Sequence, residues 1–408
     1  MAQASTFCGG SWPVVGVVMA AGIITAIHAG KVAIATPMLQ QVLGIDLAAV
    51  GWLTGIFAVL GFAGGLPAGA LTGLAGDRRS LVAGLTVTAI GAGIGATTSE
   101  YQLLLASRSL EGAGFLLITV AGPALLGRAV PPAQHDAAFA LWSCFMPVGL
   151  ALALLVGPLF EDWRMLWWAG AGGAALTGLA VRAIVPAAPQ RIPTSWTRLV
   201  SDAREVVVRR AVLLSAGCFA LYSLMFFALF SFLPVLLATR MALSHGTAGW
   251  FSALAICANI IGNLSAGYVL ARGTGRAALI SGACLIMGLS SFGIFLGAFG
   301  NATVFLLCVL FAAAGGLIPA ALISAAPSLA GSAARTPLTL GLLMQGSNLG
   351  QMIGPAAVGS SIAAYGWPAA AALVAGAAVI AALAARRIAF DDHTDTRQPR
   401  RRDGEKIG

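Results

Sequence analysis

The sequence predicts an all-α membrane protein of twelve transmembrane helices, arranged as two pseudo-symmetric six-helix halves. The chain of 408 residues is 59% apolar and only 9% charged, whereas a soluble domain carries about 25% charged residues. Its apolar runs form twelve segments of about the length that crosses a bilayer. The two halves of the chain also resemble each other in sequence. Together these three observations predict the fold class.

The twelve segments are separated by short polar breaks, and each is close to the roughly 20 apolar residues that a span requires. They lie at 13–37, 48–74, 80–98, 101–126, 136–160, 164–185, 211–238, 246–270, 275–297, 301–325, 336–360 and 366–388. The predicted divisions are an N-terminal six-helix bundle (1–185), a cytoplasmic linker (186–210), a C-terminal six-helix bundle (211–388) and a charged cytoplasmic tail (389–408).

The basic residues are distributed unevenly over the predicted loops. With the amino terminus in the cytoplasm, cytoplasmic segments hold 19 of the 23 Lys and Arg residues. The opposite side holds Arg164 and Arg240, while Lys31 and Arg108 fall inside spans. Because basic residues concentrate on the cytoplasmic side of membrane proteins, we expect both termini in the cytoplasm and the chain in a bacterial inner membrane. The net charge of +9 then reflects topology, and no nucleic-acid partner is expected.

An internal repeat relates the second segment to the eighth and the fifth to the eleventh. The aligned pairs are Gly51 with Gly249, Trp52 with Trp250 and Gly64 with Gly262 at a shift of 198 residues, and Gly149 with Gly346 at a shift of 197. Duplicated halves of this kind build transporters whose substrate site lies at the interface of the halves, near the membrane midplane.

Several motifs resemble the major facilitator superfamily. They are Gly69, Gly73 and Gly76 with Asp77, Arg78 and Arg79 after the second segment, Arg108 with Gly112 and Gly114 in the fourth, and Gly157-Pro158 in the fifth. The resemblance covers the whole chain and implies a secondary transporter, in which the first and fourth helices line a central cavity. It also implies a gating loop at Asp77, Arg78 and Arg79, although Gly73 stands where the family has an Asp.

Two further stretches, 28–37 and 259–273, resemble a branch of that superfamily with cyanate and nitroimidazole permeases and related riboflavin and copper importers. This resemblance implies uptake of a small solute, with riboflavin as the specific prediction. A cyanate or small organic anion permease and a drug efflux transporter are the alternatives. Copper is disfavoured because no Met, His or Cys pair stands at helical spacing near Met225 or His245. A transporter-like membrane sensor is the hypothesis from a different class.

Away from the ends of the predicted spans, four ionisable residues other than Cys and Tyr fall inside them: His28, Lys31, Arg108 and Glu111. A charge at the bilayer centre costs about 2.5–3.5 kcal/mol, so we expect these side chains to face a cavity. His28 and Lys31 are three residues apart on one span, and Arg108 and Glu111 are three apart on another, so the two members of each pair share a helix face. We interpret them as a substrate or proton-coupling site, with His28 or Glu111 as proton carrier. The alternative is a structural Arg108–Glu111 bridge with Lys31 extending toward the interface.

Candidate substrate contacts in the second half are two amide pairs and an aromatic stripe, all at helical spacing. They are Asn259 with Asn263, Gln345 with Asn348, and Tyr222, Phe226 and Phe230. The amides could bind polar substrate atoms or join neighbouring helices. The aromatic rings could stack on a flat substrate or pack in the core.

The sequence carries no pattern that indicates an enzyme or a resident cofactor. The six cysteines form no CxxC pair, so no metal site is expected. No phosphate-binding Walker loop is present, so ATP drive is not indicated. No nucleophile–base cluster suggests catalysis. The expected partners are a small-molecule substrate, with proton coupling as one option, and the lipid bilayer around a monomer.

Overall fold

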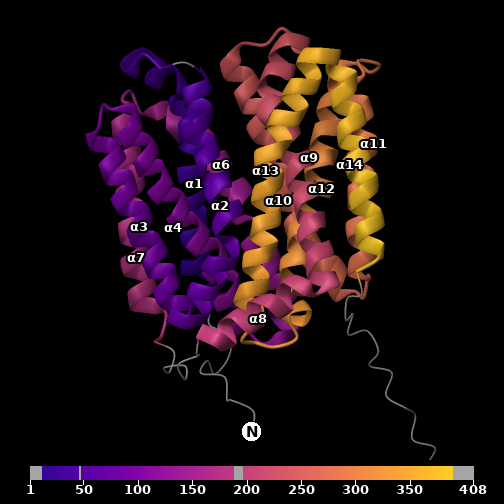
Figure 1. Ribbon diagram of the computed structural model, residues 1–408. Helices are drawn as coiled ribbons and strands as arrows, with labels where there is room; N and C mark the ends of the chain where they lie inside the picture. Colours follow the sequence, from indigo (N-terminus) through magenta and orange to yellow (C-terminus); the bar gives the residue numbers. More distant parts are fainter. Residues whose placement is uncertain (1–11, 46, 188–195, 389–408) are drawn as a thin grey trace, which may run out of the picture.

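The structure, a computed structural model, describes residues 12–45, 47–187 and 196–388. These residues form a bundle of long helices, and the described part of the chain contains no strand (Figure 1). The predicted all-α fold class is thereby confirmed.

The helix bounds follow the predicted segments closely. In chain order they are α1 (Trp12–Leu43), α2 (Leu47–Ala75), α3 (Asp77–Thr97), α4 (Tyr101–Ala129), η1 (Pro132–Gln134), α5 (His135–Ser143), α6 (Phe145–Val156), η2 (Gly157–Leu159), α7 (Trp163–Ile184), α8 (Trp196–Val208), α9 (Arg210–Met241), α10 (His245–Ala271), α11 (Arg276–Phe295), α12 (Asn301–Ala330), α13 (Thr336–Tyr365) and α14 (Trp367–Arg386). Each predicted segment overlaps one long helix, except the fifth, which is divided between α5 and α6.

Ten helical stretches of the described chain are long and apolar enough to cross a membrane. Helices α7 and α13 fall outside this set. Helix α7 nevertheless exposes Leu176 and Leu179 on its surface, as a lipid-facing helix would. Helix α13 lies between α9 and α2, so protein covers much of its surface and it needs fewer apolar residues. The count of twelve spanning helices stays a prediction.

The fifth segment is interrupted in its middle. Helix α5 ends at Ser143, Cys144 forms a turn, and α6 begins at Phe145. Pro147 has no backbone N–H, so it cannot donate the helical hydrogen bond that the carbonyl of Ser143 would otherwise accept. The sequence therefore explains why two short helices replace one long one.

The predicted linker is partly helical. Helix α8 occupies Trp196–Val208 within the range 186–210 and contacts α9, α13 and α2 at one end of the bundle (Figure 1). Helix α8 therefore contacts helices of both halves at that end of the bundle.

The sequence repeat extends to helix packing. Because glycine has no side chain, a neighbouring helix can approach it closely. In each aligned pair, the helix that approaches the first glycine corresponds, in the repeat, to the helix that approaches the second. The contacts are Gly64 (α2) with Leu116 (α4) and its equivalent Gly262 (α10) with Ala313 (α12), and Gly149 (α6) with Ala26 (α1) and its equivalent Gly346 (α13) with Ala216 (α9). Equivalent glycines thus make equivalent contacts, as two duplicated halves require.

Helices α2 and α13 join the two halves through a line of small residues. This glycine seam consists of Gly61, Gly65 and Gly69 of α2 with Gly341 of α13. A Cβ atom on Gly65 would collide with the carbonyl oxygen of Gly341, and a Cβ atom on Gly341 would collide with that of Gly65. Gln345 adds a hydrogen bond from its Nε2 to the Phe62 carbonyl oxygen, 2.7 Å away.

A second contact between the halves forms where α5 meets α10. The Gly267 backbone lies against Ala140 and the carbonyl of Asp136, both 3.1 Å from an added Cβ. Arg276 at the start of α11 donates from Nη2 to Asp136 Oδ1 over 2.9 Å. This contact and the glycine seam close the same end of the molecule.

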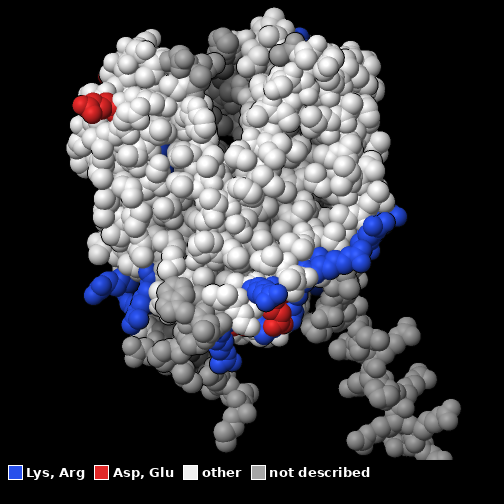
Figure 2. Space-filling view, viewed as in Figure 1, with Lys and Arg blue, Asp and Glu red and all other residues white. Residues whose placement is uncertain are grey.

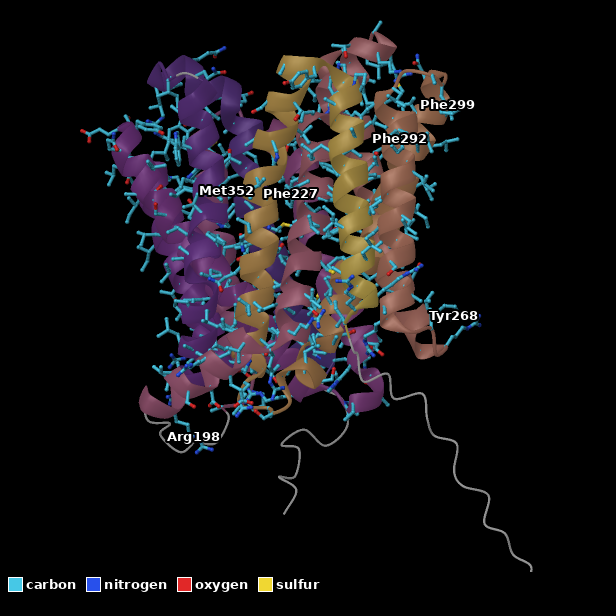
Figure 3. The ribbon with its side chains drawn as sticks, turned by 45° about the vertical axis from the view of Figure 1, so that its right-hand side comes forward. Arg198, Phe227, Tyr268, Phe292, Phe299 and Met352 are labelled. Atoms are coloured by element: carbon cyan, nitrogen blue, oxygen red, sulfur yellow. The ribbon has the colours of Figure 1, made fainter. Side chains whose placement is uncertain are left out.

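At the opposite end the halves separate, and a cleft opens between them at the top of Figure 2. Beyond the seam on α2, Gly55 and Gly51 have no neighbour within 4 Å of an added Cβ. Met352 lies seven residues after Gln345 on the same face of α13, and it is 36% exposed. Figure 3 places Met352 on the side of α13 that faces the N-terminal helices.

The outer surface is apolar along most of its height. Figure 2 shows Lys and Arg gathered mainly at the closed end, where α1 begins and α14 ends. Exposed Phe292, Phe299 and Tyr268 project from the C-terminal half in Figure 3. The Arg272 guanidinium lies 4.2 Å from the centre of the Tyr268 ring, a pairing suited to a membrane–water boundary.

Candidate functional site

The structure brings the four intramembrane ionisable residues into one cluster. His28 and Lys31 lie on α1, and Arg108 and Glu111 lie on α4. His28, Arg108 and Glu111 are 0% exposed, and Lys31 is 1% exposed. We call this group the charged cluster. Away from the helix ends, and leaving aside the short linker helix α8, the described helices have no other ionisable side chain apart from Cys and Tyr.

The carboxylate oxygen Oε2 of Glu111 is the centre of the charged cluster. It lies 2.9 Å from His28 Nδ1, 2.8 Å from Lys31 Nζ and 2.6 Å from Arg108 Nη1. The other carboxylate oxygen, Oε1, is buried without a hydrogen-bond partner among the described residues. One acid therefore faces two cations and a histidine, so the cluster carries a net positive charge when His28 is neutral.

Arg108 ties three helices together. Its Nε donates to the Leu53 carbonyl oxygen of α2 over 3.1 Å, and its Nη1 donates to the His28 carbonyl oxygen of α1 over 2.9 Å. The guanidinium carbon lies 4.1 Å from the centre of the Phe57 ring on α2. Any movement of α4 relative to α1 or α2 would therefore disturb the charged cluster.

His28 has two competing partners at a single ring nitrogen. Nδ1 lies 2.9 Å from Glu111 Oε2 and 3.0 Å from Lys31 Nζ. A protonated Nδ1 donates to the carboxylate, whereas an unprotonated Nδ1 accepts from the ammonium group, and one tautomer cannot do both. The position of one proton thus decides which hydrogen bond forms.

The cluster does not face the cleft, and the prediction of a cavity-facing position was wrong. All four side chains are enclosed in the N-terminal half, between α1, α2, α4 and α7. Trp167 of α7 lies over Lys31, with Nζ 4.2 Å from the ring centre, and His28 lies against Gly170 of the same helix. Lys31 does not extend toward the interface either. Aromatic faces attract cations, so the rings partly replace the water that these charges lose.

The aromatic stripe of α9 is part of the protein core. Tyr222 and Phe226 are buried at 6% and 3% exposure, and Phe230 packs against them. The ring centres of Tyr222 and Phe226 are 5.8 Å apart, and those of Phe226 and Phe230 are 4.5 Å apart. The structure therefore favours core packing over the alternative of stacking on a substrate.

Asn259 joins helices inside the C-terminal half, and Asn263 contacts Asn259 within α10. Asn259 Nδ2 donates to the Ala312 carbonyl oxygen of α12 over 2.9 Å and lies 3.4 Å from the Tyr222 hydroxyl. Asn263 Nδ2 donates to Asn259 Oδ1 over 2.8 Å. Both side chains are buried, and the contact with α12 means that the geometry of Asn259 fits the interhelical role.

Gln345 and Asn348 lie where the two halves meet. Gln345 reaches α2 through the hydrogen bond to the Phe62 carbonyl oxygen, and the Asn348 side chain contacts Gly61. These two candidates therefore stand at the floor of the cleft, between the glycine seam and the open end.

The predicted gating loop is divided between two places. Asp77, which is buried, forms an ion pair with Arg128 in the last turn of α4. Arg78 and Arg79 take no part in that pair and line a separate cavity. Asp77 thus supplies an ion pair although Gly73 stands at the expected acidic position.

Sequence reasoning missed the charged residues that bridge the closed end. Besides Asp136 with Arg276, Arg335 before α13 pairs with Asp202 over 2.8 Å and also with Glu205, both on α8. The sequence separations are 133 residues for Arg335 with Asp202, 130 for Arg335 with Glu205 and 140 for Asp136 with Arg276. No local pattern could have found them.

Comparison with known proteins decides the family. The sequence model of the family described as Major Facilitator Superfamily matches residues 17–336, which is more than half of the chain. The chain belongs to the Major Facilitator Superfamily. A solved structure of the human organic anion transporter MFSD10 has the same fold, with a TM-score of 0.74, 18% identity, and coverage of 92% of this chain and 99% of that one.

Curated relatives within the Major Facilitator Superfamily are distant. The tetracenomycin C resistance and export protein of Streptomyces glaucescens is 28% identical over 202 residues, 47% of this chain and 37% of the relative. The multidrug transporter mfsC of Aspergillus fumigatus is 28% identical over 142 residues, 34% of this chain and 27% of the relative. Plastidic glucose transporter 4 of Arabidopsis thaliana is 29% identical over 175 residues, 42% of this chain and 32% of the relative. Each match thus spans less than two fifths of the relative's length.

Proposed function

We propose that this protein is a secondary transporter that moves a small organic solute across a membrane by alternating access. One observation carries the proposal: the two halves are sealed together at one end and separated by a cleft at the other (Figure 2). The seals consist of glycine backbone contacts and solvent-accessible ion pairs. Such contacts can separate and re-form without exposing a large apolar core.

The proposed orientation places the closed end in the cytoplasm of a bacterial cell, with both termini there. The gathering of basic residues at this end supports it. The cleft then faces the outside, and a solute would enter it above Gln345 and Asn348.

We further propose that the charged cluster couples transport to proton movement. In the observed arrangement, the Glu111 carboxylate lies within 2.9 Å of nitrogen atoms from Lys31, Arg108 and His28. Because Arg108 also holds the backbones of α1 and α2, a relative shift of these helices would withdraw donors from Glu111. Protonation would thereby be linked to the conformational change.

The nature of the cleft supports an uncharged or weakly polar solute. The described intramembrane charges are buried in the N-terminal half and are not available to a solute in the cleft. Efflux of apolar compounds is a second candidate on this observation, and the names of the drug and antibiotic export relatives agree with it. Cyanate uptake through Lys31 and Arg108 would require those residues to reach the cleft.

Riboflavin uptake stays a prediction, as does membership in the branch of cyanate permeases and riboflavin importers. Riboflavin uptake has less support than the transporter proposal. The resemblance of residues 28–37 and 259–273, the lack of copper ligands and the aromatic stripe motivated it, and in that stripe Tyr222 and Phe226 are packed in the core. A direct experiment is rescue of a riboflavin auxotroph that lacks its own importer, at low external riboflavin. Growth would support riboflavin as a solute, and lack of growth with the protein present in the membrane would exclude it.

Counterflow in proteoliposomes tests the transporter proposal itself. Vesicles would be loaded with unlabelled solute and given labelled riboflavin, labelled cyanate or a planar fluorescent dye outside. Uptake above that of protein-free vesicles, for any of them, supports transport. Binding of a solute without any flux would instead identify a membrane sensor.

A further inference from the structure

A basic cavity of about 380 Å³ lies at the closed end of the N-terminal half, on the side of α3 and α7. Its lining consists of Arg78, Arg79, Val82 and Ala83 of α3 and Arg182 of α7. Figure 2 shows basic side chains at this lower edge of the half. The cavity is separate from the cleft and from the charged cluster.

The three arginines of this cavity have no carboxylate partner among the described residues. None of the described ion pairs includes Arg78, Arg79 or Arg182, and the neighbouring Asp77 is paired with Arg128. Arg78 Nη2 donates to the backbone carbonyl oxygen of Arg182 over 2.6 Å. Its buried Nε has no hydrogen-bond partner in the described chain. Three positive groups thus line a space into which the described part of the chain places no acidic side chain.

The walls above the arginines are apolar and face outward. Leu179 and Leu176 precede Arg182 by three and six residues on α7, and they are 64% and 69% exposed. On α3, Ile90 lies seven residues after Ala83 and is 54% exposed. A spacing of three or seven residues keeps side chains close to one helix face. Leu179 therefore continues the face of Arg182, Leu176 lies three residues beyond Leu179, and Ile90 continues the face of Ala83 away from the cavity.

We propose that this cavity binds the phosphate of an anionic phospholipid. The guanidinium groups of Arg78, Arg79 and Arg182 would hold the phosphate oxygens, since arginine forks match phosphate geometry. The acyl chains would lie along Leu179, Leu176 and Ile90. Basic pockets between membrane helices on the cytoplasmic side are suited to such head groups. A free phosphate ion shares the head-group chemistry but would leave these apolar side chains uncovered.

The test is a binding titration of the purified full-length protein in a neutral detergent. The shift in the midpoint of thermal unfolding reports binding. The ligands are cardiolipin, phosphatidylcholine and inorganic phosphate. The variant is Arg79→Gln with Arg182→Gln, which keeps the backbone carbonyl that accepts from Arg78. The matched control is Arg386→Gln with Arg387→Gln, because these exposed arginines end α14 and give the same change in net charge.

Cardiolipin should raise the midpoint in the wild type and the control, while phosphatidylcholine should not. In the variant, apparent cardiolipin affinity should fall about 30-fold, the loss expected for two basic residues at an anionic surface. Equal cardiolipin affinity in variant and control would overturn the proposal, and so would an equal effect from inorganic phosphate. If the double variant fails to fold, Arg79→Gln alone provides the comparison. The readout is binding, so it does not depend on transport.

Discussion

At the scale of the residue, one carboxylate oxygen organises the charged cluster. Glu111 Oε2 lies within 2.9 Å of nitrogen atoms from His28, Lys31 and Arg108. Removing one partner of a buried charge group leaves the remaining charges uncompensated, which costs far more than the net value of the pair. The free-energy cost of removing a charged side chain must differ among the members of this cluster, because one acid neutralises two cations.

We predict that Glu111→Gln is much more destabilising than Lys31→Met. The first change leaves two buried cations without an acid, at a cost of about 3–5 kcal/mol. The second leaves Arg108 and Glu111 as a balanced pair. The described cysteines are buried or half-buried, so a fluorogenic thiol probe in a Cys8→Ser background can follow their exposure on heating. Similar unfolding midpoints for the two variants would contradict this charge balance.

At the scale of the element, close helix contacts depend on residues without side chains. Gly65 and Gly341 bring the backbones of α2 and α13 together, whereas Gly55 on the same helix α2 has open space beside it. A larger residue should therefore have opposite consequences at two positions only ten residues apart.

We predict that Gly65→Val separates α2 from α13 at the closed end, while Gly55→Val leaves the contact intact. Both changes carry the same helix-propensity effect, so the difference isolates the collision with α13. A single cysteine at Leu338, which is 2% exposed, would report the separation. Its reactivity with a membrane-permeant maleimide should rise at least about fivefold in Gly65→Val, since forcing extra methyl groups into a packed contact costs about 1–3 kcal/mol. Unchanged reactivity would show that the seam does not hold the end closed.

At the scale of the whole molecule, charged residues from both halves hold the closed end. The pair between Asp136 and Arg276 joins α5 to α11, and Arg335 joins the start of α13 to α8. Partly exposed pairs contribute about 0–1 kcal/mol each. That is enough to shift a balanced conformational equilibrium severalfold, without locking the protein in one state.

We predict that Asp136→Arg weakens the closed end and that the exchange Asp136→Arg with Arg276→Asp restores it. The single change places two positive groups together, and the exchange recreates an opposite-charge pair. Solute flux in proteoliposomes and thiol reactivity at position 338 would both be measured. Failure of the exchange to recover either quantity would show that the pair contributes nothing to closure.

The orientation can be checked in intact cells. In a Cys-free background, a cysteine at Tyr365, the 81% exposed last residue of α13, should react with an impermeant thiol reagent. Cysteines at Arg198 and Arg402 should not react, because the basic segments are expected in the cytoplasm. Labelling of the latter pair from outside would reverse the topology.

The sequence predicted elements better than it predicted the environment of individual side chains. Helix positions follow from apolar length, and the repeat from aligned glycines, so both were readable along the chain. Hydropathy located His28, Lys31, Arg108 and Glu111 but could not show what covers them. The Trp167 ring comes from another helix and looks, in sequence, like an ordinary membrane-facing residue.

That position of Trp167 gives the protein an internal optical reporter. The indole ring is fully buried and lies 4.2 Å from the Lys31 ammonium nitrogen. Indole emission responds to nearby charge, so the colour and intensity of this tryptophan depend on whether the ammonium group and its carboxylate partner stay in place. A Trp167→Phe variant would identify its share of the emission. The remaining signal could then be subtracted while solute or protons are added, without attaching any external label.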